Sequence, residues 1–128
     1  MNADEAFSLP KTDIAGLNEE IDTYFGQMSE QARNLYAVTN PAEARDASRR
    51  LRRERGIAST YRWAASHANA SKQPIYLYLF EHVEPGSEEW GAFHTSEVPY
   101  ALQTLDKASN RSFGAVDLAV SEMMASYW

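Results

Sequence analysis

The most constraining feature of the sequence is a short uncharged run at residues 75–80, Ile-Tyr-Leu-Tyr-Leu-Phe, flanked by Pro74 and by Pro85-Gly86. Its β-branched, aromatic and leucine side chains favour a strand, and the run is too short for a buried helix. A strand that is apolar on both faces is typical of the centre of a parallel sheet. We therefore expect one strong buried strand over about residues 75–82. Because a single strand cannot satisfy its own backbone donors and acceptors, it would need partners.

The remaining pattern predicts a mostly helical chain. The clearest start signal is Asn40-Pro41-Ala42-Glu43, which fits an N-cap, a proline at the first helical position and a capping-box acid. Gly56 is expected to break or bend the helix that follows. By residue range, the expected helices are 14–25, a shorter one after Ser29, one broken helix or two over 41–69, a turn at 98–102, and a last helix from about 114.

Composition limits the classes of protein that the chain can belong to. Its 128 residues suit one domain, and 44% of them are hydrophobic, as in ordinary globular proteins. There is no cysteine, which excludes disulfides, thiolate metal sites and a cysteine nucleophile. A formal net charge of −6 disfavours nucleic acid as a partner. No apolar run approaches the ~18 residues that span a bilayer, so we expect no membrane partner.

Candidate chemistry lies in the loop that follows the expected strand. His94 is placed just past the carboxyl end of an apolar run, where an α/β hydrolase carries its catalytic base. Taken alone, a histidine beside aromatic residues is more often a packed or surface residue than a base. His67 and His82 have no second ligand at metal spacing, so no metal site is expected.

Four segments carry a family resemblance, and two of them, the run at 75–82 and the helix at 117–128, resemble the strand before and the helix after the motif given next. Gly91-Ala92-Phe93-His94, followed by Glu97-Val98-Pro99-Tyr100, resembles the catalytic-histidine motif of the type B carboxylesterases, a family that includes para-nitrobenzyl esterases and cholinesterases. Asn2-Ala3-Asp4-Glu5 resembles the strand end that bears the catalytic acid of that family, although Ala6 stands where the family usually has glycine. The resemblance covers essentially the whole chain and implies an α/β-hydrolase fold of which residues 1–128 form the C-terminal portion, truncated at both ends.

The resemblance implies a role for each of four residues. His94 would be the general base and Glu5 the acid that orients it, in a Ser–Glu–His acyl-enzyme mechanism acting on a small carboxylic ester without a cofactor or a metal. Asp4 competes with Glu5 for the acid role, but adjacent residues of an extended segment point in opposite directions. Glu97 would brace the histidine loop by hydrogen bonding.

The serine nucleophile of that mechanism is not found in the sequence. No pair of glycines brackets a serine as Gly-x-Ser-x-Gly, and Ser96 lacks the strand–elbow–helix context of a nucleophile. In this fold the acid follows the serine along the chain, so the nucleophile is expected upstream of residue 1. The isolated chain is therefore predicted to be inactive, and to need as partner the missing N-terminal part of the hydrolase or another copy of itself.

Two other functions fit parts of the sequence. The chain could be a non-catalytic, mostly helical interaction module that associates through its unpaired strand. Six arginines between residues 45 and 55 could also suggest nucleic-acid binding. Glu43, Asp46 and Glu54 interleave with these arginines at a spacing that suits pairs within one helix, which favours a solvated helix face.

Overall fold

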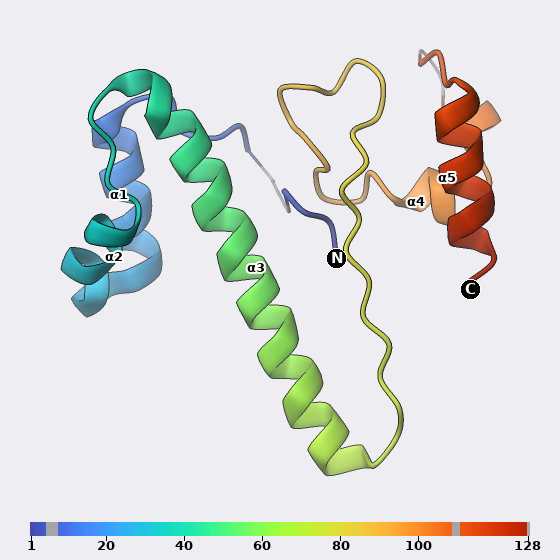
Figure 1. The fold of residues 1–128 in the computed structure, drawn as a ribbon, viewed down its shortest axis with the longest axis horizontal. Helices are drawn as coiled ribbons and strands as arrows, with labels where there is room; N and C mark the ends of the chain where they lie inside the picture. The colour runs from blue at the N-terminus through green and yellow to red at the C-terminus, as the bar shows by residue number, and fades with distance from the viewer. Residues whose placement is uncertain (5–7, 109–110, 128) are drawn as a thin grey trace.

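The fold is known from a computed structural model that describes residues 1–4, 8–108 and 111–127. In this part of the chain the regular structure is helical (Figure 1). The helices are α1 (Ile14–Phe25), α2 (Ser29–Leu35), α3 (Pro41–Ser71), α4 (Val98–Ala101) and α5 (Ala115–Ala125), with 3₁₀ turns at Gly26–Met28 and Leu105–Lys107. The expectation of a mostly helical chain is confirmed.

Side chains at the first turns fix where α1 and α3 begin. The Gly16 N–H donates to Asp13 Oδ1 at 2.7 Å, and the Glu43 N–H donates to Asn40 Oδ1 at 3.1 Å. Each side chain satisfies a donor that the helix itself leaves unpaired. The predicted cap at Asn40, with Pro41 at the first helical position, is confirmed.

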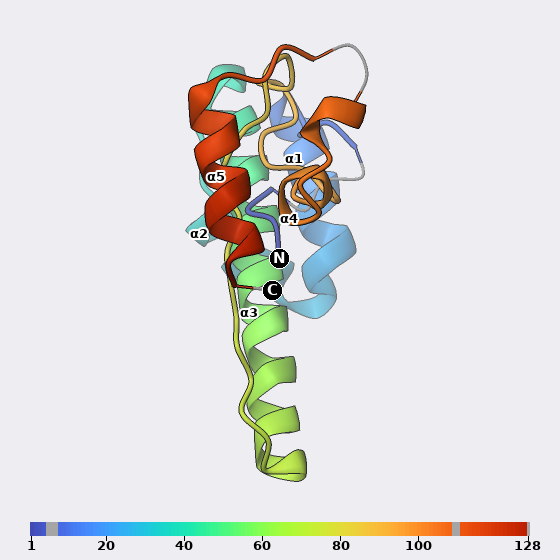
Figure 2. The same cartoon turned by 90° about the vertical axis from the view of Figure 1, so that its right-hand side faces the viewer.

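α3 is a single continuous helix of 31 residues, so the predicted break at Gly56 is wrong. A glycine inside a helix costs only about 1 kcal/mol relative to alanine, which the flanking turns can absorb. The helix ends at Ser71, and Lys72 caps it with a left-handed backbone (φ 56°) that closes the last turn. The second half of α3 extends well past α1 and α2 (Figures 1 and 2).

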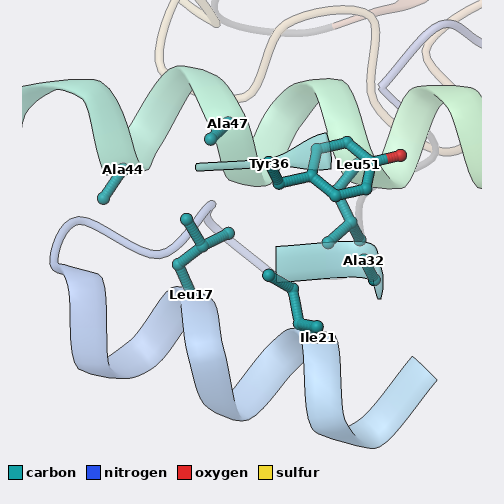
Figure 3. Close-up of a cluster of buried hydrophobic side chains, with 7 residues drawn as sticks. All are labelled: Leu17, Ile21, Ala32, Tyr36, Ala44, Ala47 and Leu51. Carbon is teal, nitrogen blue, oxygen red and sulfur yellow. The ribbon is translucent and has the colours of Figure 1, made fainter. Parts of the chain in front are cut away.

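A first hydrophobic cluster joins α1, α2 and the first half of α3 (Figure 3). It contains Leu17, Ile21, Ala32, Tyr36, Ala44, Ala47 and Leu51. The small side chains of Ala44 and Ala47 let α3 approach α1 closely. At the edge of the cluster, Tyr36 donates its hydroxyl proton to Glu54 at 2.8 Å. Burial and this hydrogen bond raise the pKa of Tyr36 to about 12.

A second hydrophobic cluster is packed against α5 and includes a residue of α4. It contains Ala3, Phe80, Ala92, Tyr100 and Leu105, with Val120 and Met124 of α5 packed against it. Tyr100 of α4 is fully buried. This cluster brings together the start of the chain, the segment around residue 80 and both C-terminal helices.

The buried strand expected at residues 75–82 is not found, and that prediction is wrong for this structure. Tyr76 is 89% exposed and Leu77 is 52% exposed. In the described residues, the pairing of this segment is one isolated parallel bridge between Phe80 and Asn2. The physical reason is that an extended apolar segment becomes a buried strand only where neighbouring strands pair its backbone. Within residues 75–82 the buried side chain is that of Phe80, which packs in the second hydrophobic cluster.

Within the described residues, no helix combines the length and the apolar character needed to cross a bilayer.

Candidate active site at the histidine loop

The first four residues lie between the segment around residue 80 and the loop that carries His94. The Phe80 N–H donates to the Met1 carbonyl at 2.9 Å, and the Ala3 N–H donates to the Phe80 carbonyl at 2.7 Å. On the next residue, the Asp4 N–H donates to the Ala92 carbonyl at 3.1 Å. The start of the chain therefore serves as a bridge between two segments that are far away in sequence.

Asp4 is fixed by backbone groups of the histidine loop. Its carboxylate Oδ2 accepts the Ala92 N–H at 2.9 Å, which adds to the Asp4 N–H bond to Ala92. The approach is possible because residue 91 is a glycine with φ +70°. A Cβ at that position would lie 2.3 Å from Asp4 Oδ2.

The histidine loop, residues 91–97, is closed by its own hydrogen bonds. The Phe93 carbonyl accepts the Ser96 N–H at 3.1 Å and the Ser96 hydroxyl at 2.8 Å. Thr95 adopts a left-handed conformation with φ +69°, which turns the chain into α4. His94 and Thr95 are exposed at this turn, whereas Ser96 is buried.

Glu97 is tied to the start of the chain through Asn2. The Asn2 side-chain amide, which is 1% exposed, donates to Glu97 Oε2 at 2.6 Å. The same amide nitrogen donates to the Phe93 carbonyl and lies 3.2 Å from Ser96 Oγ. One buried amide therefore contacts the loop on both sides of His94.

The structure places three of the four predicted site residues. His94 is exposed on the histidine loop, and Asp4 accepts a hydrogen bond from Ala92 of that loop. Glu97 is the last residue of the loop and accepts a hydrogen bond from the Asn2 amide. Glu5, the predicted acid, lies outside the described residues. Sequence analysis gave Asn2 no role of its own. The available signal was its spacing, because Asn2 and Asp4 share one face of an extended segment.

A comparison with models of known protein families identifies the family of this chain. A model of the carboxylesterase family matches residues 3–128, which include Asp4 and the histidine loop. The chain belongs to the carboxylesterase family. The search of curated proteins and the search of solved structures each found no match. The family match suggests a domain of the α/β-hydrolase type.

Behind the histidine loop, this carboxylesterase chain buries a carboxylate that joins α4 to α5. Asp117, at the start of α5, lies 2.7 Å from both His82 Nε2 and the Tyr100 hydroxyl through Oδ1. Its Oδ2 accepts the Gly114 N–H at 2.7 Å. Burial acts to raise the pKa of Asp117, but the hydrogen bonds from these three partners outweigh it and lower the pKa. Sequence analysis missed this group, because nothing local marks Asp117 as buried.

A second buried carboxylate of the carboxylesterase chain is Glu84, whose side chain is fully buried. The guanidinium of Arg111 pairs with its Oε2, and the Ser87 hydroxyl lies 3.2 Å from its Oε1. The guanidinium of Arg111 therefore compensates the negative charge of Glu84, which is removed from solvent. Together with Asp117 this pair braces the segment that leads into the histidine loop.

The structure gives the carboxylesterase chain no metal centre among its described residues. No group of three or more His, Asp or Glu side chains there is arranged to hold an ion. His82 instead pairs with Asp117, and the ring of His67 stacks on Trp63 with centroids 5.3 Å apart.

An open groove lies beside α3, away from the histidine loop. It is lined by Phe25, Tyr36, Glu54, Arg55, Ala58, Ser59, Arg62 and Trp63. It shares no residue with the histidine loop.

Proposed function

We propose that this chain is the acid- and histidine-bearing portion of a type B carboxylesterase, which cleaves carboxylic esters through an acyl-enzyme. One observation carries the proposal. The segment directly before Glu5 is hydrogen-bonded to the loop that bears His94, by the Asp4 N–H to the Ala92 carbonyl and by the Ala92 N–H to Asp4 Oδ2. The family match over residues 3–128 supports the same reading.

In the proposed mechanism the two residues handle one proton. A serine hydroxyl is a poor nucleophile, so neutral His94 removes its proton as the oxygen attacks the ester carbonyl. The resulting imidazolium then protonates the leaving alkoxide. Glu5 accepts a hydrogen bond from the other ring nitrogen, which fixes the tautomer and stabilises the imidazolium. Water then attacks the acyl-enzyme with His94 again acting as the base, which releases the carboxylic acid and returns a proton to the serine oxygen. The two residues of this chain handle only protons, and the steps call for no cofactor.

The attacking serine would come from outside these 128 residues. The sequence contains no Gly-x-Ser-x-Gly motif, which is the elbow that presents the nucleophile in α/β hydrolases. Asp4 and Glu97 are proposed as supporting residues, because each makes a hydrogen bond that ties the histidine loop to the start of the chain. The natural partner is then the nucleophile-bearing part of the hydrolase, and the isolated chain is inactive.

A fusion protein tests the catalytic assignment. The nucleophile-bearing portion of a type B carboxylesterase, ending before its acid-bearing strand, is joined to Met1, and hydrolysis of para-nitrophenyl butyrate is measured. We expect turnover that falls at least about 1,000-fold with His94→Ala and with Glu5→Gln. The matched controls are His67→Ala and Glu122→Gln, which change exposed residues of α3 and α5. Turnover that is indifferent to His94 would contradict the proposal.

The isolated chain tests the origin of the nucleophile. We expect the pure 128-residue polypeptide to show no turnover of the same ester above background. If it did turn the ester over, and His94→Ala abolished that activity, the nucleophile would lie within the chain and this part of the proposal would be wrong.

A second candidate function is association through the segment at residues 75–79. The observation that favours it is exposure: Tyr76 is 89%, Leu77 52% and Leu79 40% exposed, and an extended apolar segment is suited to pair with another chain. Size-exclusion chromatography with light scattering of the natural chain and of Leu77→Lys distinguishes the cases. A dimer of the natural chain that becomes a monomer in Leu77→Lys supports association through this segment. A natural chain that is monomeric at all concentrations contradicts it.

A further inference from the structure

We propose that Asn2 is a positioning residue for His94, which acts through the backbone and side chains of the histidine loop. The inference rests on the proposed function, because it assigns Asn2 a part in the geometry of that same site. Asn2 would not touch the reacting atoms. It would set where the histidine loop lies relative to the segment that leads into Glu5, three residues further along the chain.

The contacts of the Asn2 amide are the basis of the proposal. An amide nitrogen carries two hydrogens, and two of its acceptors are the Phe93 carbonyl and Glu97 Oε2, the latter at 2.6 Å. The Ser96 hydroxyl, 3.2 Å from the same nitrogen, donates its own proton to the Phe93 carbonyl. The amide thus holds the residue directly before His94 and the residue three positions after it.

The chemistry of the pocket selects an amide at residue 2. Asn2 is 1% exposed and faces a carbonyl oxygen and a carboxylate oxygen, both of which only accept hydrogen bonds. A short side chain with two donors satisfies both at once. A carboxylate of the same shape would place acceptor against acceptor and one negative charge against another in a desolvated site, where the repulsion is strong.

The hydrogen bonds from Asn2 matter for catalysis because they hold the loop that carries His94. His94 and Thr95 are exposed at the turn, and the buried Asn2 amide holds Phe93 before them and Glu97 after them. Asn2 is bound to the segment around residue 80 by the bridge with Phe80. A general base has to be held within hydrogen-bond reach of the proton it removes, and small displacements of a catalytic group lower the rate by large factors.

The first test uses the isolated chain and needs no activity. Asn2→Asp is isosteric but loses both donors, and Asn69→Asp is its control, because Asn69 is exposed on α3. We expect Asn2→Asp to speed amide hydrogen exchange at Ala92, Ser96 and Val98 about tenfold or more, the factor for loss of a hydrogen bond to a charged group. Exchange in α1–α3 should stay within twofold. The double variant Asn2→Asp with Glu97→Gln restores a donor–acceptor pair with reversed direction, and should recover part of the protection.

The second test separates positioning from a merely structural role. In the fusion protein with para-nitrophenyl butyrate, Asn2→Asp should lower kcat about tenfold or more while KM stays within about twofold, because binding is unchanged and only the base is displaced. The double variant should recover part of the lost kcat, and Asn69→Asp should match the natural chain. If Asn2→Asp unfolds the chain, Asn2→Ser replaces it, since one hydroxyl keeps one donor and should give a smaller loss.

Each outcome decides between the claims. Unchanged loop exchange and unchanged kcat in Asn2→Asp overturn the inference. Faster loop exchange with unchanged kcat also overturns it, because Asn2 would then hold the loop without serving the reaction. If the fusion protein carrying the natural sequence is inactive, the proposed function fails, and with it the catalytic role of Asn2. In that case loop exchange still decides whether Asn2 holds the loop.

Discussion

Among single residues, Asp117 shows how one buried carboxylate joins two helices to a loop. It is 5% exposed, and it accepts hydrogen bonds from Tyr100 of α4, from the Gly114 N–H and from the ring of His82. Its pKa is lowered in the folded state. A group whose folded pKa lies below its unfolded value of about 3.9 stabilises the fold above that pH. The contribution is lost as the pH falls through the lowered folded pKa.

Replacement of that carboxylate should change both the stability and its dependence on pH. Asp117→Asn presents an NH₂ to groups that donate, so we expect the free energy of unfolding to fall by about 2 kcal/mol at pH 7. The loss of stability between pH 5 and pH 3 should also be smaller than in the natural chain. Urea denaturation across this range measures both effects. Asp46→Asn, at an exposed site on α3, is the control, and equal acid sensitivity in the natural chain and Asp117→Asn would refute the argument.

A comparison of alanine substitutions at two glycines with left-handed backbones tests the contact between Asp4 and the histidine loop. Gly91 (φ +70°) and Gly86 (φ +80°) both penalise a side chain through their backbone angle, by about 1 kcal/mol for alanine. A Cβ at Gly91 would also meet Asp4 Oδ2 at 2.3 Å, whereas one at Gly86 would meet nothing within 4 Å. Gly91→Ala should therefore cost at least about 1 kcal/mol more than Gly86→Ala in thermal or urea unfolding. Equal costs would show that Asp4 moves aside freely.

At the scale of elements, the arginines of α3 form a largely solvated face that also contacts neighbouring segments. The side chains of Arg45, Arg50 and Arg53 are 38–53% exposed, whereas that of Arg52 is 10% exposed. The prediction of pairs within the helix holds for Arg50 with Glu54 at 3.7 Å. Other arginines reach across to other segments: Arg52 binds Glu20 of α1 at 2.5 Å, Arg53 pairs with Glu81, Arg49 donates to the Glu88 carbonyl at 3.0 Å, Arg45 lies 3.8 Å from Glu89, and Arg55 stacks over Tyr24 at 4.1 Å. Helical spacing alone could not show this, because long arginine side chains reach partners that only the fold brings near.

The continuity of α3 leads to a prediction about its glycine. Gly56 lies inside the helix, and a Cβ there would meet only the flexible end of the Met1 side chain, at 2.8 Å. Alanine is the better helix former by about 0.8–1.0 kcal/mol. Gly56→Ala should therefore raise the free energy of unfolding by roughly 0.5–1 kcal/mol once Met1 has moved aside. Circular dichroism at 222 nm during urea unfolding measures it, and a lower stability would mean that Met1 cannot move without disturbing Asn2.

For the molecule as a whole, the sequence predicted the features that depend on neighbouring residues, and it missed those that depend on residues far away in the chain. The helix starts and the cap at Asn40 follow from neighbours within four residues, and the structure agrees with them, although it does not show the break predicted at Gly56. Burial of residues 75–82 depends on a partner that no local pattern contains, and that prediction was wrong. The histidine loop was found through a family motif. The Asn2 amide depends on contacts over 91–95 positions of sequence, which no local signal reports.

The two hydrophobic clusters should respond separately to a cavity. Leu51 is fully buried in the cluster of α1–α3, and Leu105 is 6% exposed in the cluster of α4 and α5. The clusters share no residue. They are connected by polar contacts of α3 arginines with residues 81–89, which are weak where exposed, and by the end of the Met1 side chain near Gly56 of α3. Leu51→Ala should cost about 2–5 kcal/mol and speed hydrogen exchange mainly in α1–α3, while Leu105→Ala should do so mainly around α4 and α5. Because partly independent clusters open one at a time, uniform acceleration by either variant would show instead that the chain unfolds as one cooperative unit.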